Sequence, residues 1–534
     1  MMDQETFSIV FDTLKKIERD KLPLEKKLEM DERGDFPEDL IRFMLGPDIG
    51  LHLIFVPAEY GGLGASALQI AKISEEMAKI DMAIATSFLA ICLGMDPLRV
   101  GATEDQREKY IRRIADEGLI VGYAVTEPEA GSNVQVLKTK AERVLDEKGD
   151  IKGYKINGQK QFITNGGVAD LYTILVDTPE GPSFFILERG TRGLVPGKHE
   201  DKHGIRASNT APIALEDVYV PAENLVGCVE GIGLKQANRV FGYTRLMVAT
   251  FGLAAGMSAL EKIISYAKER VQFGTTLAEK QGYTHKFLVA HAVRLEAARA
   301  YIEEVAARID SGEEGLQAEG SIAKYFATEA GDAAANDGIQ ALGGYGYIRE
   351  FEVEKIKRDV KITTIFEGTS EIQQNIISVF RLRHTIHTRG EYYRRMAEAL
   401  SGLPAETGGP MLAQAIGLLN ELLLVARRIK ATKSQYDMFL LADMMTWAEV
   451  AKATCLKARS KERGIERSEE FMMAVARLFA REATEKVYIN ALKILNGTRH
   501  VSEELTEKIN SLSLQGVFEG ALTDMDIVAK ELIS

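Results

Sequence analysis

Apolar residues recur at helical spacing in the first part of the chain, as Phe7, Val10, Phe11 and Leu14 do. From residue 119 to about residue 231, short β-branched runs alternate with Gly, Asn, Asp and Pro, which predicts a small β-domain. Helical patterns then return and continue to the end, interrupted by a Gly/Pro-rich break at residues 401–410. The pattern predicts a mainly α protein with a central β-domain, divided into residues 1–118, 119–231, 232–383 and 384–534.

Two uncharged stretches, residues 82–95 and 246–260, are shorter than the roughly 18 apolar residues that a membrane-spanning helix needs. They predict helices buried in a protein core. In the last part of the chain, an apolar stripe predicts either a helix that faces the core of a dimer-capping helical domain or a helix that contacts a membrane surface. Because amphipathic helices of soluble proteins usually face a core, we favour the first alternative. The stripe consists of Leu412, Ile416, Leu419, Leu422 and Leu423.

Composition excludes several classes of protein. Lys and Arg number 66 and Asp and Glu 78, and the net charge of −12 disfavours nucleic acid as a partner. Cys92, Cys228 and Cys455 are isolated, so the sequence predicts neither a metal site nor a disulfide framework and is typical of a reducing compartment. The first residues have no apolar signal core and no Arg-rich character, so we expect a cytoplasmic protein.

Two stretches of the predicted β-domain carry candidate chemistry. Residues 123–133, YAVTEPEAGSN, lead from a strand into a turn whose hydroxyls and N–H groups suit a polar ring edge or a phosphate. An ordinary surface loop is the alternative. Residues 161–167, QFITNGG, place an aromatic and a hydroxyl residue before a predicted type I′ turn at Asn165 and Gly166, or simply end a hairpin there. The Gly-rich and P-loop nucleotide signatures do not occur.

Three further stretches lie in the predicted helical part. Arg270 of the run RVQFG lies near a predicted helix end. It could pair with a phosphate or merely interact favourably with the helix dipole. In QALGGYGY, residues 340–347, three glycines allow close approach of a flat or anionic ligand, or stop a helix. In IFEGTSEIQ, residues 365–373, Ser370 and Gln373 predict a capping box, which places Glu367 just before a helix. Considered alone, a glutamate in such a position is more often an ordinary loop carboxylate than a catalytic base.

Together and in this order, the five stretches resemble the flavin-dependent acyl-CoA dehydrogenase family from about residue 5 to residue 383. AVTEPEAGSN, QALGGYGYIREFEVEKIKRD and IFEGTSEIQ carry the resemblance. It implies an N-terminal helical domain, a middle β-barrel-like domain and a helical bundle that carries the base. Residues 384–534 would add a helical domain, as in the layout of the very-long-chain branch. FAD would lie between the β-domain and the bundle, completed by a neighbouring subunit of a homodimer or homotetramer.

The resemblance also implies roles for single residues. Glu367 would remove the α-proton of an acyl-CoA while the β-hydrogen leaves as hydride to flavin N5, and an electron-transfer flavoprotein would accept the electrons, as in fatty acid β-oxidation. Near Phe366 we expect the pKa of Glu367 to be raised. Members with the base on an earlier helix carry it at the position of Thr244, so Glu367 is the implied base. The implied FAD contacts are Tyr123, Val125, Thr126, Ser132, Phe162, Ile163, Thr164, Arg270, Gln272, Phe273, Gln281, Gln340, Gly343, Gly344, Thr369 and Glu371, and the implied substrate contacts are Ser132, Thr244, Arg245, Phe366 and Gly368.

Some positions depart from the family pattern. Asn133 stands where Asp is common and Glu129 where Gly is common, which affects the expected CoA contacts. Residues 82–95 contain no arginine, which disfavours a glutaryl-type substrate. Other functions on this fold are a flavin-binding or DNA-associated protein without dehydrogenase activity, and an oxidase or monooxygenase that uses oxygen. The net charge and the presence of Glu367 oppose the binding-protein alternative.

Overall fold

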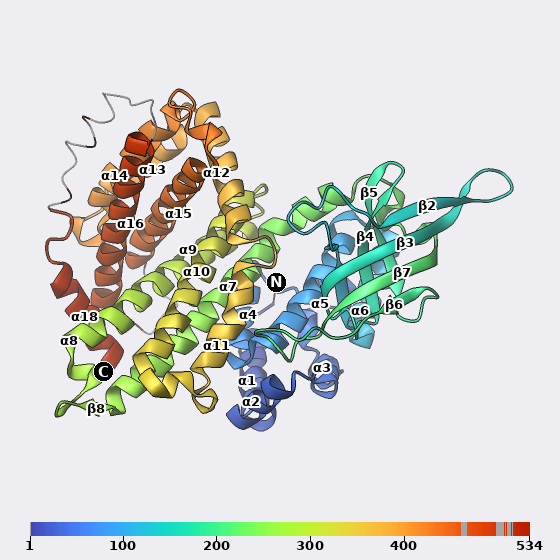
Figure 1. Ribbon diagram of the computed structural model, residues 1–534, viewed down its shortest axis with the longest axis horizontal. Helices are drawn as coiled ribbons and strands as arrows, with labels where there is room; N and C mark the ends of the chain where they lie inside the picture. The colour runs from blue at the N-terminus through green and yellow to red at the C-terminus, as the bar shows by residue number, and fades with distance from the viewer. Residues whose placement is uncertain (1, 461–466, 498–506, 508, 510–513, 515) are drawn as a thin grey trace. The chain divides into compact units, whose positions relative to one another are not determined.

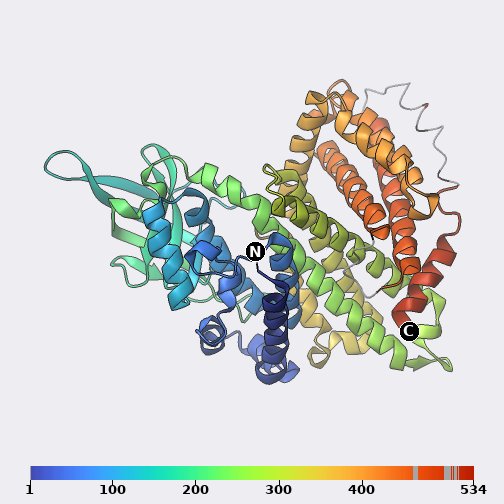
Figure 2. The same cartoon turned by 180° about the vertical axis from the view of Figure 1, so that it is seen from behind.

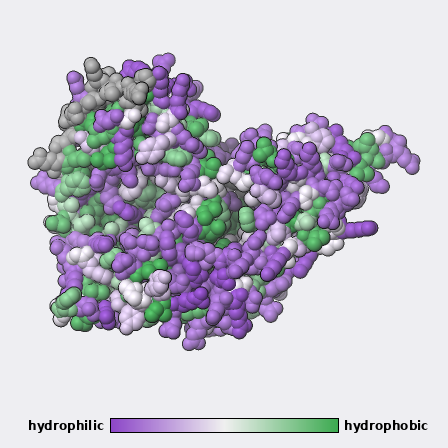
Figure 3. Space-filling view, viewed as in Figure 1, coloured by the Kyte–Doolittle hydropathy of each residue, from purple (hydrophilic) through white to green (hydrophobic). Residues whose placement is uncertain are grey.

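The structure is a computed structural model that describes residues 2–460, 467–497, 507, 509, 514 and 516–534. The chain forms two compact units, Met1–Met247 and Val248–Ser534, each of which is described by itself. Figure 1 shows the helices and strands of each unit, and Figure 2 shows them from behind. On the face in Figure 3, hydrophilic residues cover most of the surface and apolar residues occur in small groups. The expected mainly α fold with a β-domain is confirmed.

The first unit begins with helices whose starts follow from the sequence. Ser66 with Gln69, and Thr103 with Gln106, form capping boxes that begin α4 and α6. Among these helices α5 is almost entirely buried, as its uncharged sequence predicts. The helices are α1 (Gln4–Lys21), α2 (Leu24–Arg33), α3 (Glu38–Leu45), α4 (Ala67–Ile80), α5 (Met82–Gly101) and α6 (Glu104–Glu117), with short 3-10 turns η1 (Leu51–Ile54) and η2 (Ala58–Tyr60).

Two helices, Met82–Gly101 and Thr244–Glu269, are long and apolar enough to span a membrane, although the uncharged stretches within them are shorter. In their most apolar windows, 89% and 72% of the residues are buried inside the structure. Such burial is typical of the core helices that the sequence predicts.

Seven strands form one sheet within the described residues of the first unit. β1 pairs with β4 in parallel, and β3 pairs with β2 and β7 in antiparallel orientation. Helix α5 packs on this sheet so closely that a Cβ on Gly94 would lie 2.4 Å from Val121. The strands are β1 (Val121–Ala124), β2 (Lys140–Leu145), β3 (Ile151–Thr164), β4 (Leu171–Thr178), β5 (Gly181–Glu188), β6 (Leu194–Pro196) and β7 (Thr210–Pro221), followed by η3 (Ala222–Asn224) and η4 (Val226–Cys228).

The predicted type I′ turn at Asn165 and Gly166 is wrong. Only Asn165 has a positive φ, of 61°, whereas the turn needs positive φ at both positions. The side chain of Asn165 is buried and donates to the carbonyl oxygens of Ser87 and Val121, at 3.0 and 3.1 Å. Asn165 therefore braces the end of β3 against α5 and β1 instead of forming a hairpin tip.

Helix α7 (Gly233–Glu269) leads into the second unit, which is a bundle of helices. Small residues allow close helix packing, since a Cβ on Gly331 of α10 would lie 2.0 Å from the carbonyl oxygen of Gly252 of α7. The next elements are β8 (Val271–Gln272), β9 (Thr275–Thr276), η5 (Leu277–Glu279), α8 (Gln281–Tyr283), the π-helix η6 (Thr284–Val289), α9 (Ala290–Asp310), α10 (Gln317–Leu342), η7 (Gly343–Tyr347), η8 (Arg349–Phe351), α11 (Val353–Val360), η9 (Lys361–Thr364) and α12 (Ser370–His387).

Residues 384–534, the C-terminal extension, belong to the same compact unit as this bundle. Helix α15 packs on α9 and α12, and α16 packs on α9. All five residues of the apolar stripe on α14 are fully buried, which confirms the expectation that the stripe faces a core. The division of the chain into four domains stays a prediction. The elements of the extension are α13 (Glu391–Ser401), η10 (Ala405–Thr407), α14 (Gly409–Val425), η11 (Ala431–Lys433), α15 (Gln435–Ala458), α16 (Glu469–Gly497) and α18 (Ala521–Ile533).

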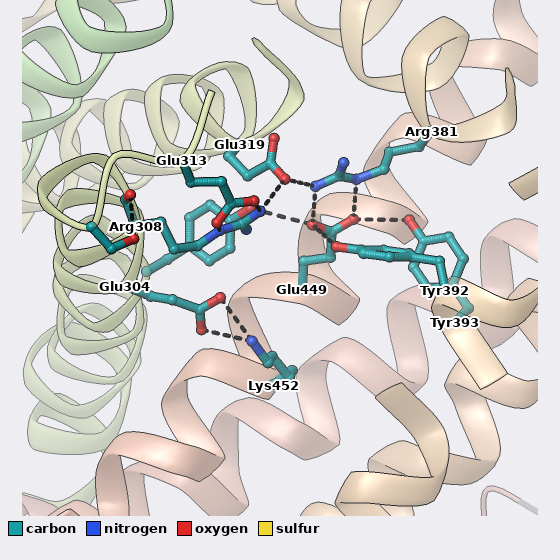
Figure 4. A network of polar contacts seen from close by, with 11 residues as sticks. Glu304, Arg308, Glu313, Glu319, Arg381, Tyr392, Tyr393, Glu449 and Lys452 are labelled. Carbon is teal, nitrogen blue, oxygen red and sulfur yellow. Dashed lines mark hydrogen bonds and ion pairs between the residues drawn. The ribbon is translucent and has the colours of Figure 1, made fainter. Parts of the chain in front are cut away.

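A buried polar network joins the extension to the bundle (Figure 4). Arg381 of α12 makes a two-pronged ion pair with Glu449 of α15, with both N–O distances 2.7 Å. Tyr392 and Tyr393 of α13 donate to the same carboxylate, at 3.1 and 2.9 Å. Burial opposes the charge of Glu449, but the guanidinium and the tyrosine hydroxyls hold its pKa below the usual value. Arg381 also pairs with Glu319 of α10, so the network fixes several helices together.

We predict that Arg381→Met lowers the stability of the second unit. The change leaves the carboxylate of Glu449 buried without its cation, which costs about 3–5 kcal/mol of unfolding free energy. Trp447, the single tryptophan of the chain, lies on α15 and reports unfolding by its fluorescence in denaturant. The double variant Arg381→Met/Glu449→Leu should lose less unfolding free energy than Arg381→Met. Arg395→Met, which removes an exposed ion pair, should change the unfolding free energy little. An unaltered transition in Arg381→Met would contradict the assigned role of the network.

Candidate functional site

The residues around Glu367 form a tight turn between η9 and α12. Glu367 has a φ of 56° and Gly368 a φ of 91°, so both lie in the left-handed region. For a residue with a side chain this conformation is rare and is concentrated at functional sites. A Cβ on Gly368 would also lie 2.7 Å from the amide nitrogen of Gln373, so this position requires glycine.

Side chains from two helices hold the carbonyl groups of this turn. Gln373 of α12 donates from Nε2 to the carbonyl oxygens of Glu367 and Gly368, at 3.0 and 2.9 Å. The buried Nζ of Lys324 on α10 donates to the carbonyl oxygen of Gly368 at 2.6 Å. These donors satisfy the carbonyl groups of the turn, so they fix the backbone that carries the carboxylate.

The predicted capping box of Ser370 and Gln373 is wrong. The N-cap of α12 is Thr369, whose hydroxyl accepts from the N–H of Ile372 at 3.4 Å. Gln373 is used for the turn carbonyls, and the Ser370 hydroxyl donates to Glu329 of α10. The helix start was therefore expected one residue too late, although Glu367 does lie just before it.

The other predicted residues of this segment differ in exposure. Phe366 and Thr369 are half-buried beside Glu367, and Glu371 is exposed in the first turn of α12. A hydrogen bond from the Thr369 side chain lowers the pKa of Glu371, which keeps its carboxylate ionised near neutral pH. Glu367 and Glu371 thus present two carboxyl groups on neighbouring backbone.

A second cluster of predicted residues, also in the second unit, surrounds a pocket of about 470 Å³. Arg270 and Gln272 lie on one side of it and the glycines that follow α10 on the other. The Arg270 guanidinium carbon lies 5.8 Å from the centre of the Tyr345 ring. The pocket offers a cation, an aromatic ring and bare backbone. Its lining is Tyr266, Arg270, Gln272, Leu277, Ala341, Leu342, Gly343, Gly344, Tyr345 and Ile348.

The glycines and the hairpin beside this pocket leave room for a ligand. A Cβ on Gly343 or Gly344 would meet nothing within 4 Å. Phe273 and Gly274, with φ of 52° and 84°, form the two-residue turn between β8 and β9, and the Phe273 side chain is 97% exposed. Gln281 is exposed and donates to Asp526 of α18 at 3.1 Å, and Gln340 is exposed in the last turn of α10.

A third cluster lies in the first unit, where the loop after β1 meets the end of β3. The N–H of Gln161 donates to the carbonyl oxygen of Thr126 at 2.9 Å and places the two segments side by side. The register of β3 against β7 shifts between Lys160 and Ile163, a bulge that re-aims the side chain between them. Phe162 has a φ of 58° and is 63% exposed. The predicted FAD contacts on these two segments are therefore neighbours.

The individual residues of the third cluster vary in their surroundings. The ring of Tyr123 stacks on that of Phe184 with centroids 5.7 Å apart. Thr126 and Thr164 are half-buried, whereas Val125 and Ile163 are buried in the unit. Ser132 is exposed, as are Glu129 and Asn133, two of the positions that depart from the family pattern.

A buried ion pair under this loop was not predicted from the sequence. Lys160 of β3 donates to Glu127 at 2.7 Å and to the carbonyl oxygen of Val125 at 3.1 Å. Glu127 also accepts from the N–H groups of Lys138 and Thr139. Burial lowers the pKa of Lys160 to about 8, and for Glu127 the effect of burial is outweighed by Lys160 and the N–H donors, which lower its pKa. The pair ties both ends of the loop to β3.

Thr244 and Arg245, predicted to contact substrate, are both buried on α7. The hydroxyl of Thr244 has no hydrogen-bond partner within the part of the chain that the structure describes. Residues 2–460 and the other described ranges contain no group of three or more His, Cys, Asp or Glu side chains placed to hold a metal ion. The predicted residues thus fall into three clusters and this pair on α7.

Comparison with known proteins places most of the chain in one family. Residues 6–118, 122–218 and 231–380 match the N-terminal, middle and C-terminal domains of acyl-CoA dehydrogenase, in that order. An acyl-CoA dehydrogenase of Bacillus subtilis is 38% identical over 364 residues, which are 67% of this chain and 93% of that protein. A cyclohex-1-ene-1-carbonyl-CoA dehydrogenase of Geobacter metallireducens is 36% identical, over 66% of this chain and 91% of that protein.

A solved structure also matches the C-terminal extension. It is the crystal structure of an acyl-CoA dehydrogenase from Bacillus anthracis complexed with FAD, with a TM-score of 0.87 and 25% sequence identity. The match covers 99% of this chain and 95% of that chain. The extension is therefore part of a fold that at least one solved relative shares.

We predict that Glu127→Gln destabilises the protein at pH 7 and that this effect disappears in acid. The change leaves Lys160 buried without its counter-charge, at a cost of about 3–5 kcal/mol. The pKa of Glu127 in the folded protein is lower than the 4.5 of a free side chain. Its contribution is therefore complete above pH 4.5 and is lost as the pH falls through the folded value.

The measurement is denaturant unfolding of both proteins, followed by circular dichroism between pH 7 and pH 3. Glu129→Gln, which removes an exposed carboxylate from the same loop, is the control and should behave like the wild type. A difference between wild type and Glu127→Gln that stays constant down to pH 3 would refute the assigned role of the ion pair.

Proposed function

The chain belongs to the acyl-CoA dehydrogenase family, and we propose that it converts an acyl-CoA thioester to trans-2-enoyl-CoA with Glu367 as the base. That it is an FAD-dependent enzyme that oxidises acyl-CoA follows from the family. One observation carries the proposal: the glutamate at the family's base position lies in a left-handed turn whose carbonyl groups are held by Gln373 and Lys324.

The residues of the chain fit FAD. Phe162 presents an exposed ring at a bulge next to the hydroxyl residues of the first unit, which suits an isoalloxazine ring. The pocket beside Arg270, with open space over Gly343 and Gly344, suits a pyrophosphate and a flat base. FAD supplies the acceptor for the hydride, at flavin N5.

We also propose that the enzyme is a homo-oligomer in which a neighbouring subunit covers the pocket beside Arg270. Phe273 supports this, because its ring is almost fully exposed and its backbone is in a conformation that is costly for a residue with a side chain. Both features are expected where another molecule covers the residue.

In the proposed reaction, the carboxylate of Glu367 accepts the proton from the α-carbon of the acyl group. The backbone N–H of Glu367 donates to the thioester carbonyl oxygen, where negative charge develops. Gln373 and Lys324 hold the turn, so the carboxylate and the N–H keep a fixed relation to each other. Phe366 and Gly368 flank the base. For Thr244 and Arg245 on α7, the resemblance implies contacts with the substrate.

We propose an electron-transfer flavoprotein as the acceptor of the electrons, as the resemblance implies. Uptake of oxygen during turnover without that protein would instead indicate an oxidase. The acyl group is open: α5 has no arginine among residues 82–95, which disfavours a carboxylate at the end of the acyl chain.

The function is tested by adding acyl-CoAs to the purified holoenzyme without oxygen and recording its visible spectrum. The panel contains short, long, branched and cyclic acyl groups. Loss of the flavin band near about 450 nm with one of them supports the proposal and identifies the substrate class. Bound flavin that no acyl-CoA reduces would argue against acyl-CoA oxidation by this protein.

We predict that Glu367→Gln slows reduction of the bound flavin by about 10²–10⁴-fold, since the amide cannot accept the α-proton. The affinity for FAD should stay near that of the wild type. Rapid mixing of the holoenzyme with the best acyl-CoA of the panel measures the rate. Glu371→Gln, four residues further on, serves as the control for loss of a nearby carboxylate and should retain far more of the rate. If the flavin of Glu367→Gln is reduced at the wild-type rate, another group is the base.

We predict that Gly344→Ala leaves the fold intact and weakens FAD binding by about ten- to a hundredfold, because the added methyl group occupies the space proposed for the cofactor. A Cβ here meets no other atom within 4 Å, and Gly344 does not have a positive φ. Gly417→Ala on α14, where a Cβ also meets nothing, is the matched control. Equal FAD dissociation constants for both variants would place the cofactor away from Gly344.

A further inference from the structure

The C-terminal extension has no assigned part in the reaction, since the matched family domains end at residue 380. Its helix α15 nevertheless packs along α12, the helix that begins directly after the turn of Glu367. Both helices belong to the second unit. The extension therefore contacts the helix that begins directly after the turn.

Among the hydrogen bonds between described residues of α12 and α15, the one to Asp443 of α15 involves the α12 residue that is nearer the turn in sequence. Its Oδ1 accepts a hydrogen bond from Nε2 of Gln374 on α12 at 2.8 Å and another from the hydroxyl of Tyr325 on α10 at 2.8 Å. Gln374 and Tyr325 also contact each other, at 3.1 Å. Burial, and after it the Asp443 carboxylate, raise the pKa of Tyr325, so its hydroxyl remains a donor. One carboxylate thus holds side chains of two helices.

The two residues that Asp443 holds are the sequence neighbours of the two residues that hold the turn. Gln374 follows Gln373, whose amide binds the carbonyl oxygens of Glu367 and Gly368. Tyr325 follows Lys324, whose ammonium binds the carbonyl oxygen of Gly368. Adjacent residues of a helix point about 100° apart, so one of each pair faces α15 while the other faces the turn.

We propose that Asp443 is a positioning residue for Glu367, through which the C-terminal extension fixes the geometry of the proton transfer. The proposal rests on the proposed function of Glu367 as the base. Asp443 sets the distance between α10 and α12 at the level of the turn, and the donors Lys324 and Gln373 transmit this distance to its backbone.

A second contact between α12 and α15 has a different role. Arg381 and Glu449 lie farther from the turn, with side chains only 8% and 3% exposed. That pair stabilises the packing of the extension, as argued above. Asp443 and Gln374 are only half-buried, so their loss costs less stability. Along the same pair of helices, the Arg381–Glu449 contact therefore serves stability, and the Asp443–Gln374 contact serves catalysis.

The test uses the full-length holoenzyme with Asp443→Ala, Asp443→Asn and, from the opposite side of the contact, Gln374→Leu. A small displacement of a reacting group costs up to about a hundredfold in rate, so Asp443→Ala should reduce flavin about ten- to a hundredfold more slowly. Asp443→Asn keeps an acceptor oxygen and should be affected less. The KM for acyl-CoA should stay within about twofold of the wild type, because the substrate contacts remain.

Several controls separate positioning from a general structural effect. Asp437→Asn removes another carboxylate on α15, from a different face of the helix, and should react at the wild-type rate. The unfolding midpoint, from Trp447 fluorescence, should fall much less in Asp443→Ala than in Arg381→Met. Added to Glu367→Gln, the Asp443→Ala change should have no further effect, because no base remains to be positioned.

A wild-type rate in Asp443→Ala, or a slower rate accompanied by an equal loss in the unfolding midpoint and in FAD content, would overturn the proposal. If Glu367→Gln itself reacts at the wild-type rate, the proposed base fails, and this result is recognised independently of Asp443. If Glu367→Gln is inactive and Asp443→Ala is normal, only the positioning role fails.

Discussion

The turn of Glu367 and Gly368 depends on donors that come from outside it. Glu367 and Gly368 are two successive residues in the left-handed conformation, and a non-glycine residue in this state costs roughly 1–2 kcal/mol. Gln373 and Lys324 offset this cost by binding the carbonyl oxygens of these residues. The carboxylate is therefore in place only while α10 and α12 keep their spacing, and the packing of the second unit, including α15 of the extension, maintains that spacing.

Buried charges occur at the places where this arrangement has to be specific. Lys160 and Glu127 join the loop after β1 to β3 in the first unit, and Arg381 and Glu449 join α12 to α15 in the second. A buried ion pair adds little net stability compared with an apolar pair of residues. A buried charge that loses its partner, however, costs several kcal/mol of folding free energy. Each pair thus favours one arrangement of its segments. In the first unit that arrangement sets the exposed ring of Phe162 beside the loop of Thr126.

Local patterns predicted the elements well and the long-range contacts poorly. The change from helical spacing to β-branched runs located the β-domain. The glycines after residue 342 follow the end of a helix, which is one of the two interpretations that the sequence left open. The predictions for Asn165 and Gln373 were wrong. A turn and a capping box were assigned to side chains that the fold uses for contacts with other segments. Lys324 bonds to Gly368 across 44 residues and Gln374 to Asp443 across 69, and no periodicity records such pairs. The resemblance supplied the functional positions, and the structure supplied what holds them.

The central claim is that the protein removes a proton from the α-carbon and a hydride from the β-carbon of one acyl-CoA. It is tested most directly by the rate of flavin reduction with acyl-CoA that carries deuterium either at the α-carbon or at the β-carbon. The account predicts a primary isotope effect from each label, because the α-proton and the β-hydride leave in the same rate-limiting step. Reduction that is slowed by neither label, or by the β-label alone, would contradict the assignment of Glu367 as the base that drives the reaction.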